Sequence, residues 1–162
     1  MNTPRYEVVP LEEVLRRDGY DYLEAVRSGE LPSPPLYGTL GFRVKEVERG
    51  RVVVGATPGG RVYSPLGTVD AGFSSALLET AMTAAVHTLV PAGELTTPVE
   101  FKVNLVRPIY ESTGPIEAVA MVLYRGRTVA TAEGRLVDAA GKLYAHATAT
   151  CAIATPTEKR SG

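Results

Sequence analysis

The chain has little of what marks several large classes of protein. It has one cysteine among 162 residues and no tryptophan, and its 17 Lys and Arg residues nearly balance 18 Asp and Glu residues, for a formal net charge of −1. A single cysteine cannot close an internal disulfide, so we interpret Cys151 as a packing residue. Because no basic excess and no basic cluster with interleaved aromatics is present, the sequence has no electrostatic basis for binding nucleic acid.

Signals for export, membranes and metals are missing as well. The first ten residues, M-N-T-P-R-Y-E-V-V-P, have no charged start followed by an apolar run, and the one long apolar segment contains Glu, His, Ser and Thr. His87 and His146 have no cysteine or carboxylate at metal-ligand spacing. We therefore expect a soluble, cytoplasmic protein with no membrane partner and no metal site.

The length fits one globular domain with a sizeable core, preceded by an appendage. Apolar residues at helical spacing predict a helix from Leu11 to Val26, after which S-G-E-L-P-S-P-P breaks the pattern. We assign residues 1–36 to an N-terminal helical extension, residues 37–155 to the main domain and residues 156–162 to a disordered tail.

From Gly41 the apolar period changes to two, which indicates strands. G-F-R-V-K-E-V and V-V-V-G-A-T are typical of a hairpin, and four further strands follow a long apolar segment. The first of these four alternates Val99, Phe101, Val103 and Leu105 with Glu100, Lys102 and Asn104. Short turns favour antiparallel pairing, so the sequence predicts an α+β fold in which a curved antiparallel sheet wraps around one long central helix. One helix cannot cover a whole sheet edge, which favours a homodimer.

The central helix contains the most informative residue. The segment from Ala71 to Val90 is apolar around nearly its whole helical circumference, which predicts a buried helix, and only Glu79 and His87 can ionise in it. An ionised carboxylate on a buried helix is costly unless it is paired, hydrogen bonded or protonated. Glu79 is therefore the leading functional candidate, with a structural carboxylate bonded to a partner subunit as the alternative.

Five segments point to a family when they are taken together. They are S-P-L-G-T-V-D-A-G with Glu79 seven residues later, V-N-L-V-R-P, R-G-R, A-T-A-E-G and L-Y-A-H-A-T. With these segments the chain resembles the PaaI-type hotdog acyl-CoA thioesterases, which include 4-hydroxybenzoyl-CoA and phenylacetyl-CoA thioesterases. The resemblance covers about Gly38 to Ile153, and the family's typical motif is N-P-x-G-x-x-H-G-G followed by Asp or Glu on the helix. It implies a hotdog fold.

The resemblance also implies hydrolysis of an aryl or short- to medium-chain acyl-CoA thioester to the free acid and CoA, with no cofactor other than CoA in the substrate. Glu79 takes the position of the family's carboxylate, which acts as a nucleophile or activates water. Ala71 and Gly72 take the places where helix N-terminal amides stabilise an oxyanion, although close packing also explains Gly72. Thr83, one turn beyond Glu79, is expected to orient the carboxylate or a water, or to be a satisfied core hydroxyl.

The substrate-binding candidates come from the same resemblance. Arg125 and Arg127, which flank Gly126, are expected to bind the CoA phosphates near a subunit boundary, with a solvated turn as the alternative. Asn104 matches the family's Asn and is expected to bind substrate or the partner's helix, whereas Arg107 is interpreted as structural. The expected partners are a small acyl-CoA and further copies of the chain, in a homodimer and then a dimer of dimers, that is, a homotetramer.

Two positions depart from the family motif. Asp70 stands where the family has His; it is either the N-cap of the helix or an added negative charge beside the oxyanion site. Ser64 stands where Asn or Gln is usual, and a hydroxyl with a bound water could replace the amide. Both substitutions favour the alternative of a non-catalytic acyl-CoA binding or sensing protein. A hotdog dehydratase or hydratase would need a His facing an acid, for which His87 and Glu79 are poorly placed.

Overall fold

The computed structural model describes residues 5–156 and contains six strands and four α-helices within that range. The predicted tail over 156–162 lies, apart from its first residue, outside the described residues. The elements are α1 (Leu11–Leu15), α2 (Gly19–Ser28), α3 (Pro35–Leu40), β1 (Arg43–Glu48), β2 (Arg51–Ala56), η1 (Gly60–Val62), α4 (Ala71–His87), β3 (Leu95–Leu105), η2 (Glu111–Thr113), β4 (Ile116–Arg125), β5 (Val129–Asp138) and β6 (Leu143–Ala154). No helix in this range is long and apolar enough to cross a membrane.

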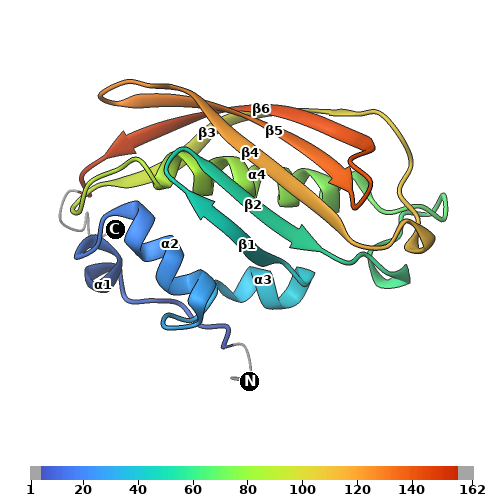
Figure 1. Ribbon diagram of the computed structural model, residues 1–162, viewed down its shortest axis with the longest axis horizontal. Helices are drawn as coiled ribbons and strands as arrows, with labels where there is room; N and C mark the ends of the chain where they lie inside the picture. The colour runs from blue at the N-terminus through green and yellow to red at the C-terminus, as the bar shows by residue number, and fades with distance from the viewer. Residues whose placement is uncertain (1–4, 157–162) are drawn as a thin grey trace, which may run out of the picture.

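The six strands form one antiparallel sheet in the order β1-β2-β4-β5-β6-β3, and α4 lies along one face of it (Figure 1). The predicted order of two strands, one buried helix and four strands is confirmed. The inner face is built from small side chains, which lets the helix approach the sheet closely. At Gly134 a methyl group would lie 3.1 Å from both Leu78 Cδ2 and Met82 Cγ. The fully buried alanines of this face are Ala118, Ala120, Ala130, Ala132, Ala145, Ala147 and Ala149.

The central helix is buried, as its apolar circumference predicts. Ten of its 17 residues are buried, and the residues left half-buried near its middle include Ser75, Ala76, Glu79 and Thr83. The helix ends three residues before Val90, because the buried Thr88 turns its hydroxyl back to donate to the Ala85 carbonyl and accepts from the Gly50 amide.

The prediction of one N-terminal helix from Leu11 to Val26 is wrong. The chain forms two helices, α1 and α2, because Asp18 accepts a hydrogen bond from the Asp21 amide and starts a new helix. Gly19 then packs against the end of α4: its amide donates to the Val90 carbonyl at 3.0 Å, and a methyl group there would lie 1.6 Å from the His87 carbonyl oxygen. A third helix, α3, begins at Pro35, the last residue of the segment interpreted as a breaker, with Pro34 at its N-cap position. Of these helices α2 packs against β1, α3 leads directly into it, and α1 lies on the far side of α2 (Figure 1).

The edge strand β3 presents an apolar face that α4 does not cover. Phe101, Val103 and Leu105 pair with the inner-facing alanines of β6, so the predicted alternation holds there, whereas Val99 lies in a bulge between Pro98 and Glu100. Phe101 is 45% and Leu105 55% exposed. Among residues 5–156, β3 pairs only with β6, so its outer edge keeps unpaired backbone groups.

Candidate active site

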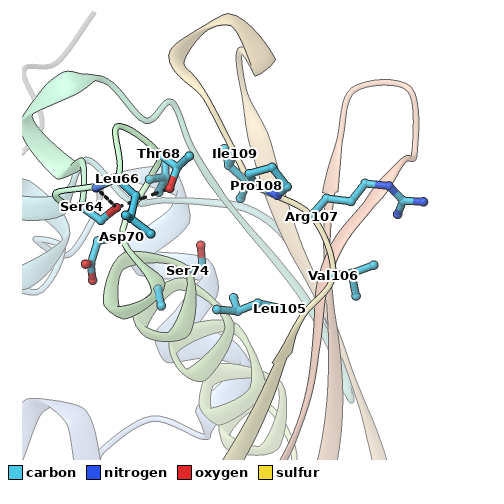
Figure 2. Close-up of a pocket in the computed structure, with 12 residues that line it drawn as sticks. Ser64, Leu66, Thr68, Asp70, Ser74, Leu105, Val106, Arg107, Pro108 and Ile109 are labelled. Atoms are coloured by element: carbon cyan, nitrogen blue, oxygen red, sulfur yellow. Dashed lines mark hydrogen bonds between the residues drawn. The ribbon is translucent and has the colours of Figure 1, made fainter.

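A cavity of about 410 Å³ opens at the N-terminus of α4. Its walls come from the turn before the helix, from the first turn of α4 and from the end of β3 with the chain that follows it (Figure 2). The structure thus brings together three of the residues singled out in the sequence: Ser64, Asp70 and Ala71. Leu105, Val106, Pro108 and Ile109 add an apolar wall on the side of β3.

Asp70 is the N-cap of α4. Its Oδ1 accepts from the Gly72 amide at 2.7 Å, and its backbone is extended, with φ −64° and ψ 143°. This is the structural role that the sequence offered for the residue. It has a chemical consequence, because the Gly72 amide is already bound to a carboxylate and is not free to stabilise an oxyanion.

The Ala71 amide is the free donor at this helix end. It has no hydrogen-bond acceptor among residues 5–156, as expected for the first residue of a helix. Beside it, Ser64 begins a tight turn in which its Oγ accepts from the Leu66 amide and its backbone amide donates to the Thr68 carbonyl. The turn needs Gly67, whose φ is +72°.

Glu79 and Thr83 lie on the half-buried side of α4 and are not part of this cavity wall. The Thr83 hydroxyl donates to Glu79 Oε1 at 2.7 Å, as expected for residues one helical turn apart. Glu79 follows Ala71 by eight residues, which places it about 12 Å along the helix axis and about 80° around it. Within one protomer, a single thioester carbonyl cannot contact both groups.

The N-terminal extension reaches the Glu79 side of the helix. Tyr37 of α3 is 9% exposed and packs near Phe42, which in turn stacks edge-on against Phe73 of α4. Burial, together with the nearby Tyr22 and Glu79, raises the pKa of Tyr37 above its usual value. The extension is therefore part of the packing around the candidate carboxylate.

His87 closes the other end of α4. Its Nδ1 lies 3.3 Å from Thr96 Oγ1, and the Tyr22 ring meets it edge-on. Burial lowers the pKa of His87 to about 4, against a smaller opposing effect of Asp18. A half-buried imidazole two turns from Glu79 does not form the facing acid and base that a dehydratase needs.

The residues predicted to bind CoA are not gathered at the cavity. Arg125, Gly126 and Arg127 form the β4–β5 turn near the C-terminal end of α4, where Arg125 pairs with Glu94 at 3.5 Å and donates to the Gly126 carbonyl. Asn104 pairs with His146 on the sheet face opposite α4.

Arg107, which is interpreted as structural from the sequence, also lines the cavity. Its Nη1 donates to the Leu143 carbonyl at 2.6 Å, and its guanidinium points away from Asp70 (Figure 2). The only sequence signal for a functional role of Arg107 is that it closely follows a predicted strand, since the loops at strand ends often carry functional residues.

Comparisons with known proteins agree with this architecture. Residues 66–145 match the family model of the Thioesterase superfamily. A phenylacetic acid degradation-related protein of Ralstonia eutropha is 28% identical, with a TM-score of 0.74 over 81% of this chain and 98% of its own. A variant of the phenylacetic acid degradation protein PaaI of Thermus thermophilus is also 28% identical, with a TM-score of 0.66 over 73% of this chain and 97% of its own. A thioesterase of Haemophilus influenzae, at 20% identity, shares the fold with a TM-score of 0.74 over 85% of this chain and 94% of its own. No curated protein sequence matches the chain.

The curved antiparallel sheet on one long helix, with a cavity at the helix N-terminus, defines a hotdog protein. The chain belongs to the thioesterase superfamily and is of the PaaI type.

Proposed function

We propose that this protein hydrolyses acyl-CoA thioesters, with aryl or short- to medium-chain acyl groups. The observation that supports this most directly is the oriented carboxylate: Glu79 is half-buried on the central helix and accepts from Thr83 at 2.7 Å. A carboxylate held in one orientation can take a proton from water or attack a carbonyl carbon. The free Ala71 amide supplies the oxyanion donor.

In the proposed reaction, Glu79 accepts a proton from water while the water oxygen attacks the thioester carbonyl. The tetrahedral oxyanion receives a hydrogen bond from the Ala71 amide. The C–S bond then breaks, the CoA sulfur leaves with a proton returned by Glu79, and the free acid remains. Direct attack by Glu79, through a mixed anhydride that water hydrolyses, uses the same two groups.

The proposed site is shared between two copies of the chain. Glu79 and the Ala71 amide of one protomer lie too far apart to act on one carbonyl, whereas the exposed Phe101 and Leu105 on the unpaired edge of β3 favour a second copy beside it. In such a homodimer the Ala71 amide of one copy faces the Glu79 carboxylate of the other. A cytoplasmic location and a dimer of dimers remain part of the same proposal.

Ala71→Pro is the sharpest test of the oxyanion donor. Proline removes the amide N–H, is favoured at the first helical position, and suits the extended backbone of Asp70 before it. We expect kcat for a panel of acyl-CoA esters, followed by thiol release, to fall about a hundredfold while the thermal midpoint stays unchanged. Ala71→Ser, which keeps the N–H, is the matched control. Full activity of Ala71→Pro would remove the amide from the mechanism.

Glu79→Gln tests the carboxylate, because it keeps the bond with Thr83 and loses the base. We expect turnover to fall to the background rate.

Mixed dimers of Glu79→Gln and Ala71→Pro test the shared site, since one of the two sites in each heterodimer is then intact. Refolding equal amounts should restore about a quarter of wild-type activity. If the mixed dimers regain no activity, Glu79 and the Ala71 amide act within one protomer and the shared site is wrong.

The hydrogen bond between Asp70 and Gly72 favours a second candidate, an acyl-CoA binding protein without efficient chemistry. It occupies one of the two helix amides and leaves a negative charge at the cavity. Tight binding of acyl-CoA without thiol release, together with turnover created by Asp70→His, would decide for this candidate.

A further inference from the structure

A second cavity, of about 370 Å³, adjoins the one at the N-terminus of α4. The two cavities share Arg107 and Pro108 as a common wall. The second one lies between the chain that follows β3, including η2, and the end of the β5–β6 turn with the start of β6. Its polar lining residues are Arg107, Tyr110, Ser112, Thr113, Lys142 and Tyr144.

The lining of this cavity carries two positively charged side chains, Arg107 and Lys142, and no acidic one. Neither Arg107 nor Lys142 forms an ion pair with any residue in the described range 5–156. The Arg107 guanidinium uses one nitrogen on the Leu143 carbonyl, and the Lys142 ammonium lies 5.6 Å from the centre of the Tyr144 ring. The remaining donors of both side chains are available to a ligand.

The nearby Asp138 carboxylate interacts electrostatically with Lys142, but its oxygens are already hydrogen bonded within the turn. Asp138 Oδ1 accepts from the Ala140 and Lys142 amides, and its Oδ2 accepts from the Tyr144 hydroxyl. Asp138 thus fixes the β5–β6 turn that presents Lys142. The exposed Ser112, which also lines the cavity, adds a hydroxyl donor. Two cations and a hydroxyl around one cavity suit the oxygens of a phosphate group.

The turn suggested by the sequence is poorly placed for the same role within a protomer. Arg125 and Arg127 lie near the C-terminal end of α4, and α4, with 17 residues, is about 25 Å long. Arg125 is also neutralised by Glu94. The Arg107–Lys142 cavity, in contrast, directly continues the cavity in which the thioester is proposed to react.

We infer that the Arg107–Lys142 cavity binds the phosphate groups of the CoA moiety while the thioester occupies the adjoining cavity at the N-terminus of α4. This inference rests on the proposed function, because the substrate is taken to be an acyl-CoA. It assigns Lys142 and the free face of Arg107 as determinants of affinity for the phosphates and gives neither residue a role at the reacting carbonyl.

The test compares one acyl group on two thiols, CoA and pantetheine, which lacks the phosphates. For Lys142→Gln we expect KM for the acyl-CoA to rise about tenfold, as for one charged hydrogen bond lost, with KM for the acyl-pantetheine unchanged. Arg107→Lys, which keeps the charge but loses the planar fork, should show the same selectivity. Lys45→Gln, on the distant strand β1, is the matched control and should change neither KM.

Two outcomes would overturn the inference. One is an unchanged KM for acyl-CoA in both variants. An equal rise in KM for acyl-CoA and acyl-pantetheine would count in the same way, because it would mean a purely structural effect. The other is a selective rise in Arg125→Gln or Arg127→Gln with none in Lys142→Gln. Calorimetric titration with CoA itself keeps the inference independent of catalysis: if the wild type hydrolyses nothing, weaker CoA binding by Lys142→Gln still supports the phosphate site.

Discussion

His87 gives the protein a pH-dependent stability that can be calculated from its surroundings. The imidazole sits at the C-terminal end of α4, where the helix dipole favours a positive charge by up to about 1 kcal/mol. Burial beneath Tyr22 opposes this and prevails, since it lowers the pKa of His87 from 6.5 to about 4. The unfolded chain therefore binds the proton more readily than the folded protein.

The sign and the pH window follow from these two pKa values. Well above pH 6.5 His87 is neutral in both states and its titration does not affect stability. As the pH falls from 6.5 toward 4, the unfolded chain gains a proton that the folded protein resists, so stability is lost. The linkage relation for pKa values of 6.5 and about 4 gives a loss of about 2 kcal/mol at pH 5 and well under about 1 kcal/mol at pH 7.

Urea unfolding of the wild type and His87→Asn at pH 7, 6 and 5 measures this difference. Asparagine keeps a polar atom near Thr96 Oγ1 but does not titrate, and the carboxylates, which titrate in the same range, cancel between the two proteins. We expect the wild type to lose about 2 kcal/mol more than the variant between pH 7 and pH 5. Parallel stability curves would show that His87 titrates normally and that the burial argument is wrong.

The other predictions concern packing, capping and assembly. Gly19→Ala should lower the free energy of unfolding by more than 2 kcal/mol in urea titrations, because the added methyl overlaps the His87 carbonyl oxygen and forces α2 away from α4; an unchanged midpoint would contradict this contact. Asp70→Ala should cost about 1 kcal/mol as a lost N-cap, whereas Asp70→Asn should cost little, since Asn caps equally well; equal losses would mean that the charge and not the cap stabilises the helix. Gly134→Val should destabilise the protein by 1–3 kcal/mol, roughly the cost of overpacking, against Leu78 and Met82, as read from the thermal midpoint. Phe101→Lys should shift the mass measured by light scattering from dimer to monomer at low concentration, because it places a charge on the exposed face of β3; an unchanged mass would locate the interface elsewhere.

The sequence by itself determined the order of elements and the nature of the central helix. Its period-two and all-round apolar patterns depend on which side chains must be buried, and burial acts on each segment separately. The same local rules placed Thr83 one turn from Glu79 and gave Asp70 its capping role, because helix geometry fixes contacts between near neighbours in the chain. The apolar spacing failed at Asp18. This residue caps a new helix and so divides the segment from Leu11 to Val26, which the spacing predicts as one helix.

Only the tertiary structure decided which distant residues meet. Lys142 and Arg107 are neighbours because two strand ends lie at the same end of the sheet, and no spacing in the sequence records that proximity. In the same way, the length of α4 separates the Arg125 turn from the cavity, and the reach of α4 across the sheet leaves Phe101 exposed. The physical reason is that local patterns specify each helix and strand, whereas the register and curvature of the whole sheet determine which residues of different elements come together.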